Sequence, residues 1–224
     1  MQFNIITLFP NMFSAISDEG VIARAIKKSI ISIKTWQLRD FSDNQYKNVD
    51  DKPYGGGAGM VMQVKPIRDC LSEIKQDSPN TKVIYLSPQG RKLNQQLVEE
   101  LSVLDSITFL CGRYEGIDER VIENDIDMEV SIGDYVISGG ELAAMVLIDA
   151  IGRRLSGVLG NESSLKDSFV NNLLDHPHYT RPEVVDGQRV PEVLLSGHQA
   201  KIDDWRQAQS IEKTKLKRPD LLDD

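Results

Sequence analysis

The feature that most constrains the fold is a regular alternation of short apolar runs with longer amphipathic segments through the first 160 residues. The apolar runs have the length and the β-branched composition of buried strands, and the segments between them place apolar residues at helical spacing. Strands are predicted at 3–8, 30–38, 82–86, 107–111 and 128–137, and helices at 12–28, 66–76, 93–104, 117–123 and 141–154. This alternation predicts an α/β domain with a mostly parallel sheet flanked by helices.

The alternation stops after Gly160. Residues 161–197 are loop-like and contain three prolines, whereas residues 198–215 resume helical spacing. We therefore expect an α/β domain at 1–160, an ordered linker at 161–197 and a small helical appendage at 198–224.

Composition narrows the class of protein. The formal net charge of −8 argues against a general nucleic-acid coat protein, so any RNA contact must use local basic clusters. The two cysteines lie far apart and outside any Cys-x-x-Cys pair, which signals neither a disulfide framework nor a zinc site. No signal-peptide pattern opens the chain and no apolar run approaches 18 residues, so we expect a soluble cytoplasmic protein and no membrane partner.

The segment 141–154 is apolar on nearly every helical face, which predicts a helix in the centre of the fold or at a subunit interface. Ser138 precedes Glu141 by three residues, the spacing of a capping box at the start of this helix.

Five residues at 55–59 include four glycines, which invites a phosphate-binding interpretation. The cluster lacks the Gly-Lys-Ser/Thr of a P-loop, and its spacing differs from Gly-x-Gly-x-x-Gly. By itself it is either a flexible surface turn or a ligand loop.

Two further segments follow predicted strands, where open α/β sheets bind ligands. Residues 111–120 form either a ligand loop or a salt-bridged helix start. In residues 131–141, glycines and polar residues interrupt an apolar strand, as they do where a backbone approaches a ligand or at a bulge before a capped helix.

The remaining candidates are weak when taken alone. His176 and His178 form a His-x-His pair, but His198 is the only other histidine, so no metal site is expected, and structural or substrate-contact roles are favoured. Asp167 is an ordinary loop aspartate. Gly-x-Ser-x-Gly does not occur, so an acyl-transfer nucleophile has no support.

Taken together, these segments resemble the bacterial tRNA (guanine-N(1)-)-methyltransferase family of the SPOUT class. The resemblance is carried in order along the whole chain by PYGGGAGM at 53–60, YLSPQGR at 85–91, CGRYEGIDERV at 111–121, SIGDYVISGGELA at 131–143, GVLGNE at 157–162, DSF at 167–169 and LLDHPHYTRPE at 173–183. Each motif alone is weak, but their conjunction is specific.

The resemblance implies a deep trefoil knot in the carboxyl part of the α/β domain, which general rules of chain topology would have argued against. It implies S-adenosyl-L-methionine as the cofactor, bound among the knot loops. It also implies a homodimer with composite active sites and a small helical domain that grips tRNA, with Lys213, Lys215, Lys217 and Arg218 as candidate contacts.

The family's site residues fall on named positions here. The resemblance implies Asp167 as general base and Arg153 as catalytic arginine, with Arg154 as the adjacent alternative. Substrate RNA is expected at Gly55, Gly57, Gly59, Arg113 and His178. Glu115 is expected to hold the cofactor's amino group or a magnesium ion. The cofactor-binding residues are expected to be Tyr85, Leu86, Ser87, Pro88, Gly112, Tyr114, Glu115, Ile132, Gly133, Asp134, Tyr135, Val136, Ile137, Gly139 and Gly140.

The implied activity is transfer of a methyl group from S-adenosyl-L-methionine to the N(1) nitrogen of the guanine immediately 3′ of the anticodon in tRNA. Two alternatives stay open at this point. One is a related knotted methyltransferase with another RNA target, and the other is a non-catalytic RNA-binding dimer.

Overall fold

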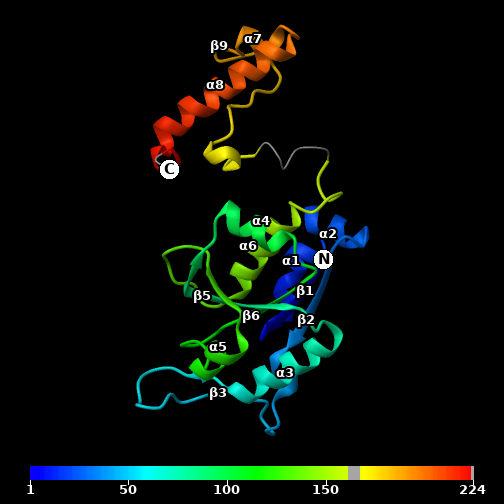
Figure 1. Cartoon of the computed structure of the whole chain (residues 1–224), viewed down its shortest axis with the longest axis vertical. Helices are drawn as coiled ribbons and strands as arrows, with labels where there is room; N and C mark the ends of the chain where they lie inside the picture. Colours follow the sequence, from blue (N-terminus) through cyan, green and yellow to red (C-terminus); the bar gives the residue numbers. More distant parts are fainter. Residues whose placement is uncertain (161–166, 223–224) are drawn as a thin grey trace. The chain divides into compact units, whose positions relative to one another are not determined.

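The computed structural model describes residues 1–160 and 167–222. The chain divides into two compact units, Met1–Gly160 (unit 1) and Asn161–Asp224 (unit 2). Figure 1 shows a sheet with helices on both faces in unit 1 and a helical unit 2, and each is described below by itself.

A five-stranded parallel sheet organises unit 1, in the order β2-β1-β6-β5-β7. Its strands are β1 (Gln2–Thr7), β2 (Ser32–Gln37), β5 (Lys82–Lys92), β6 (Ser106–Cys111) and β7 (Met128–Ser131). Successive side chains of β1 enter opposite cores, Ile5 on one face of the sheet and Ile6 on the other, and both are fully buried. Burial on both faces explains why β1, β5 and β6, in the middle of the sheet, contain continuous apolar runs, whereas the edge strand β2 is more polar and more exposed. The predicted parallel α/β sheet is confirmed.

Helices cover both faces of the sheet (Figure 1). On one face lie η1 (Pro10–Phe13), α1 (Ser14–Ser17), α2 (Gly20–Lys27), α4 (Gln95–Ser102) and α6 (Glu141–Gly152). On the other lie η2 (Leu38–Phe41), α3 (Val64–Asp77) and α5 (Glu119–Asp125). A short antiparallel pair, β3 (Asp50–Asp51) and β4 (Val61–Met62), carries the glycine-rich loop at its tip.

Three sequence predictions need correction. The single helix predicted at 12–28 is broken into η1, α1 and α2, because Gly20 takes φ +79°, a left-handed conformation that glycine adopts readily. The strand predicted at 82–86 continues to Lys92, with an irregular register against β7 after Leu86. The extended segment predicted at 128–137 is a strand only to Ser131 and then becomes a loop.

The capping box predicted at Ser138 is also wrong. Gly140 is the N-cap of α6, and no side chain caps the helix. The Glu141 carboxylate is instead committed to Thr7 and Arg113, so it cannot reach back to the backbone of residue 138.

Helix α6 is buried on one side only. Ala144, Leu147 and Ile148 are fully buried, whereas Leu142 is 50% and Val146 46% exposed. An apolar helix with one open face is the pattern expected where a second subunit packs.

Unit 2 is built around α8 (Gln199–Lys217). Before it lie η4 (Val170–Asn172), the hairpin of β8 (Val184–Val185) and β9 (Gln188–Arg189), and α7 (Glu192–Leu195); η5 (Pro219–Leu221) follows it. The segment 173–179 packs along α8: the Leu174 N–H donates to Thr214 Oγ1 at 2.8 Å, and Lys213 Nζ donates to the Asp175 carbonyl oxygen at 2.9 Å. Across the described residues, no helix combines the length and the apolarity needed to span a membrane.

Candidate active site

Three segments of unit 1 enclose a cavity of about 230 Å³. Two are the loops that follow β6 and β7, and the third, residues 85–88, lies within β5 where the register against β7 becomes irregular. The three strands are adjacent and parallel, so these segments meet at one edge of the sheet. The lining residues come from three segments, 85–88, 112–116 and 130–140, and Ala143 of α6 completes them.

All predicted cofactor residues except Asp134 line this cavity. Asp134 is exposed, and its carboxylate pairs with Lys92 Nζ at 2.7 Å. The prediction also left out Gly116, Val130, Ser131, Ser138 and Ala143, which line the cavity as well. All five lie within or next to the sequence motifs. Including every residue of each motif and its immediate neighbours would therefore have found them.

Glycines allow the loops to approach one another closely. A Cβ atom on Gly112 would lie 2.8 Å from the Tyr85 ring, and one on Gly140 would lie 2.8 Å from Cys111 Cα. The Gly140 N–H also donates to the Gly112 carbonyl oxygen at 3.0 Å. Gly112 is therefore needed because an aromatic ring lies against it, and Gly140 because the backbone of the β6 loop does.

A buried ion pair lies behind the cavity wall. The Arg113 Nε and Nη2 atoms each lie 2.9 Å from Glu141 Oε2, and Thr7 Oγ1 donates to Glu141 Oε1 at 2.8 Å. The Arg113 Nη1 atom donates to the Ser138 carbonyl oxygen at 3.0 Å. The network links the β6 loop, the β7 loop and the end of β1 through the fully buried Glu141 side chain. It thus holds two of the three cavity loops in place.

This network bears on the prediction that Arg113 contacts RNA. Its side chain is only 17% exposed, and its guanidinium lies over the Phe9 ring, 4.4 Å from the centroid. The contact with RNA stays a prediction, but the geometry gives Arg113 a first role in shaping the cavity.

Two titratable side chains near the cavity are held protonated. Burial raises the pKa of Tyr85, a lining residue, to about 12. Burial also raises the pKa of the Cys111 thiol well above its ordinary value. Neither group is available as a nucleophile or a base at neutral pH.

The glycine-rich loop lies next to the cavity. The Glu115 N–H donates to the Met60 carbonyl oxygen at 3.0 Å, and the Met62 N–H donates to the Gly116 carbonyl oxygen at 2.9 Å. Gly55, Gly57 and Gly59 all take positive φ, which side-chain-bearing residues rarely adopt. The predicted RNA-contacting loop is therefore tied to the loop that carries Glu115, whose carboxylate is exposed at the cavity.

The two candidate arginines follow α6. Arg154 Nη2 pairs with Glu99 Oε1 at 3.2 Å, and its side chain is 17% exposed. This contact joins Arg154 to α4, and Arg153 stays the predicted catalytic arginine with Arg154 as its adjacent alternative.

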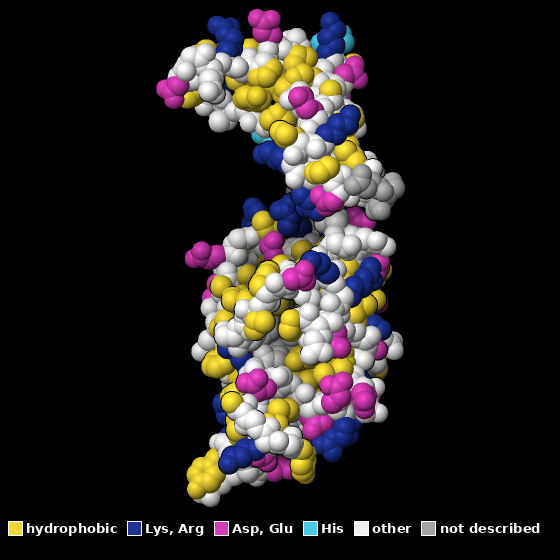
Figure 2. All heavy atoms as spheres, turned by 90° about the vertical axis from the view of Figure 1, so that its left-hand side faces the viewer, with side chains coloured by type: hydrophobic (Ala, Val, Ile, Leu, Met, Phe, Trp, Pro, Cys, Tyr) yellow, Lys and Arg dark blue, Asp and Glu magenta, His cyan; other side chains and the backbone are white. Residues whose placement is uncertain are grey.

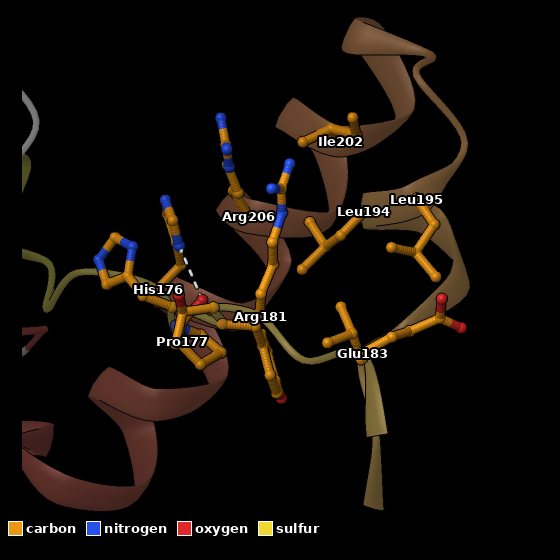
Figure 3. Close-up of a pocket in the computed structure, with 12 residues that line it drawn as sticks. His176, Pro177, Arg181, Glu183, Leu194, Leu195, Ile202 and Arg206 are labelled. Carbon is orange, nitrogen blue, oxygen red and sulfur yellow. Dashed lines mark hydrogen bonds between the residues drawn. The ribbon is translucent and has the colours of Figure 1, made fainter. Parts of the chain in front are cut away.

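In unit 2, Asp167 lines a hollow of about 310 Å³ together with Asp175, His176 and Arg206. His176 and Arg206 also border a second cavity of about 610 Å³ (Figure 3). The cavity is lined by two arginines, Arg181 and Arg206, and by the apolar side chains of Leu194, Leu195 and Ile202, all labelled in this view. His178, predicted to contact RNA, borders the second cavity, and its Nε2 atom lies 2.8 Å from Asp175 Oδ2.

Comparisons with known proteins agree with the motif resemblance. Residues 1–224 match the family described as tRNA (Guanine-1)-methyltransferase TrmD. The tRNA (guanine-N(1)-)-methyltransferase of Vibrio vulnificus strain YJ016 is 55% identical over 225 residues, covering 100% of this chain and 90% of that relative. The protein of the same description from Haemophilus ducreyi is 56% identical over 229 residues, covering 100% of this chain and 91% of the relative.

Proposed function

The chain belongs to the tRNA (guanine-1)-methyltransferase family, and on that premise we propose that it transfers a methyl group from S-adenosyl-L-methionine to the N(1) nitrogen of the guanine immediately 3′ of the anticodon in tRNA. The single observation that carries the proposal is the cavity of unit 1, where three loops bring together the residues that the motifs single out for the cofactor.

The chemistry of this cavity fits S-adenosyl-L-methionine. Leu86, Val130 and Ile137 supply apolar surface for an adenine ring, and main-chain groups of the glycine loops supply hydrogen bonds for its edge. The exposed Glu115 carboxylate suits the cofactor's amino group or a magnesium ion. When bound, the cofactor supplies a sulfonium whose methyl carbon is electrophilic, so the protein's task is alignment.

The acceptor nitrogen of guanine carries a proton and is a poor nucleophile until that proton is removed. We assign Asp167 as the base that accepts it and Arg153 as the cation that stabilises negative charge developing on the exocyclic oxygen. A guanidinium is always charged and has a fixed donor geometry, which suits this second role. The target base is expected to leave its stack, as unpaired loop bases do readily.

The proposal includes a homodimer in which each active site draws on both copies. The exposed apolar face of α6, with Leu142 and Val146, supports it, together with exposed Tyr135 and Val136 at the cavity. The passage of residues 138–140 along residues 111–113 supports the knotted path of the chain.

We further propose that unit 2 and the loop of Gly55, Gly57 and Gly59 contact tRNA in the cytoplasm. Acidic and basic side chains are interspersed on the face of unit 1 drawn in Figure 2. Binding of the tRNA phosphates must therefore depend on a few local basic side chains and not on an extended basic surface. His178 in unit 2 is one such group, and Lys213, Lys215, Lys217 and Arg218 near the end of α8 are the others.

Methyl transfer to paired transcripts tests the proposal. Incubation with S-adenosyl-L-methionine carrying a labelled methyl group should label a tRNA transcript with guanine 3′ of the anticodon and leave a matched transcript with adenine there unlabelled. Equal labelling of both would indicate another RNA target. Binding of tRNA without any binding of S-adenosyl-L-methionine would indicate a non-catalytic RNA-binding dimer.

A glycine substitution tests the cavity as the cofactor site. Gly140→Ala should weaken S-adenosyl-L-methionine binding by about 5- to 150-fold, because the added Cβ atom displaces the cavity wall and overpacking of this kind typically costs about 1–3 kcal/mol. The backbone of Gly140 is right-handed helical (φ −75°), so the effect reports the clash with Cys111 and not backbone strain. Calorimetric titration measures it. Gly160→Ala is the matched control, because a Cβ atom there meets open space; similar affinities for the two variants would disprove the assignment.

A further inference from the structure

Three side chains of types that ligate metals converge in unit 2, beside the hollow that contains Asp167. Donor atoms of Asp175, His176 and His178 all lie within 4.8 Å of one another. The centroids of the His176 and His178 imidazole rings are 4.4 Å apart. The main chain of Leu174 and Asp175 binds Thr214 and Lys213 of α8, so the three side chains take no part in holding the segment on the helix.

The tautomer of His176 can be deduced from its neighbours. Its Nδ1 atom lies 3.1 Å from the Pro177 carbonyl oxygen, which can only accept, so Nδ1 must carry the proton. A neutral ring then has its lone pair on Nε2, which lies 3.7 Å from Asp175 Oδ1. A lone pair facing a carboxylate oxygen is repulsive unless a cation lies between them, either a proton on Nε2 or a metal ion.

A histidine whose second ring nitrogen donates to a backbone carbonyl is also the usual arrangement around protein-bound metals. That bond orients the ring and selects the tautomer that can ligate. It is an observation independent of the clustering of the three side chains.

The Asp175 carboxylate is oriented by its neighbours. The His176 N–H donates to Oδ1 at 2.8 Å, the His178 ring nitrogen Nε2 lies 2.8 Å from Oδ2, and the side chain is only 26% exposed. The surroundings carry charges of both signs. Lys213 binds the Asp175 carbonyl oxygen and Arg206 and Arg181 line the adjoining cavity, whereas Asp167, Asp203 and Glu183 also line the two hollows.

We propose that Asp175, His176 and His178 form a binding site for a borderline transition-metal dication, with Zn²⁺ as the representative ion. Two imidazole nitrogens and one carboxylate oxygen are a donor set that suits Zn²⁺, Ni²⁺ or Co²⁺ better than Mg²⁺. Donor atoms in a tetrahedral zinc site lie about 3.3 Å apart, so side-chain movements of an ångström or two close the present cluster around an ion. His178 is exposed, which leaves the fourth position open.

Metal binding does not depend on the proposed methyl transfer, but the site adjoins the residues proposed for that reaction. His176 lines the hollow that contains Asp167, and His178 borders the second cavity, so an ion would fix both rings at once. A histidine count from the sequence argues against a metal site; the structure supplies Asp175 as the third ligand.

Zinc titration of the metal-stripped, untagged full-length protein tests the proposal. Isothermal calorimetry should show one saturable Zn²⁺ site per chain, and Co²⁺ should give the visible absorption of a protein-ligated ion. His178→Ala and His176→Ala should each weaken Zn²⁺ binding at least tenfold, roughly the effect of losing orientation at a metal site. His198→Ala, which removes the only histidine outside the cluster, should leave it unchanged.

Two further measurements separate a built site from adventitious binding. In histidine-labelled protein, Zn²⁺ should shift the ring nitrogen signals of His176 and His178 and not that of His198, while equimolar Mg²⁺ shifts none. Each variant is first checked by circular dichroism for an unchanged fold. Equal Zn²⁺ affinity in all three variants, or a shift confined to His198, would overturn the proposal and leave a protonated His176 as the cation of the cluster.

Discussion

Replacing Asp167 with alanine is expected to lower kcat for methyl transfer by about 10²–10⁴-fold and to leave the affinity for S-adenosyl-L-methionine unchanged. The reason is that the carboxylate acts on the proton of the acceptor base, whereas the residues expected to hold the cofactor lie in unit 1. Single-turnover assays with labelled cofactor measure the first quantity, and calorimetric titration of the cofactor measures the second.

Asp203 provides the matched control, because it lines the same hollow of unit 2 as Asp167. Asp203→Ala removes a carboxylate of equal size from the same surroundings and should keep turnover close to that of the unaltered protein. Near-normal turnover in Asp167→Ala, or an equal loss in both variants, would remove Asp167 from the role of base.

Removing the buried partner of Arg113 should have the largest effect on stability. Glu141→Leu leaves the guanidinium largely buried and without its carboxylate, which typically costs about 3–5 kcal/mol. That is a large share of the roughly 5–15 kcal/mol that stabilises a domain. Urea unfolding in a Trp205→Phe background measures it, because Trp36 then remains as the only tryptophan and reports on unit 1 alone.

The control is an exposed pair of similar geometry. Glu100→Gln removes the negative charge and one of the two hydrogen bonds that Arg91 donates to Glu100. The two side chains are 44% and 41% exposed, so the change should cost no more than about 1 kcal/mol. Combining Arg113→Met with Glu141→Leu should recover part of the loss, since no buried charge is left without a partner. An equal cost for Glu141→Leu and Glu100→Gln would contradict the role given to the buried pair.

Local pattern predicted the central architecture well. The predicted strands with apolar runs from Phe3, Val83 and Ile107 are neighbouring parallel strands in the structure, because both faces of each are buried and each run therefore consists mostly of apolar residues. The prediction of a capping box failed because the Glu141 carboxylate could bind either of two groups, the start of its own helix or a distant cation. Glu141 has the spacing of a capping box with Ser138, but a fully buried carboxylate requires a cation, and Arg113 provides it from a loop 28 residues away.

By itself, the sequence determined the parallel α/β class, through periodicity, and the methyltransferase family, through the order of its motifs along the whole chain. Only the tertiary structure decided that Asp134 turns away to Lys92, that Arg113 is largely buried, and that Asp175 joins His176 and His178. The physical reason is the range of the interactions. Periodicity reflects burial along one element, whereas these contacts depend on how loops are folded back by packing elsewhere in the chain.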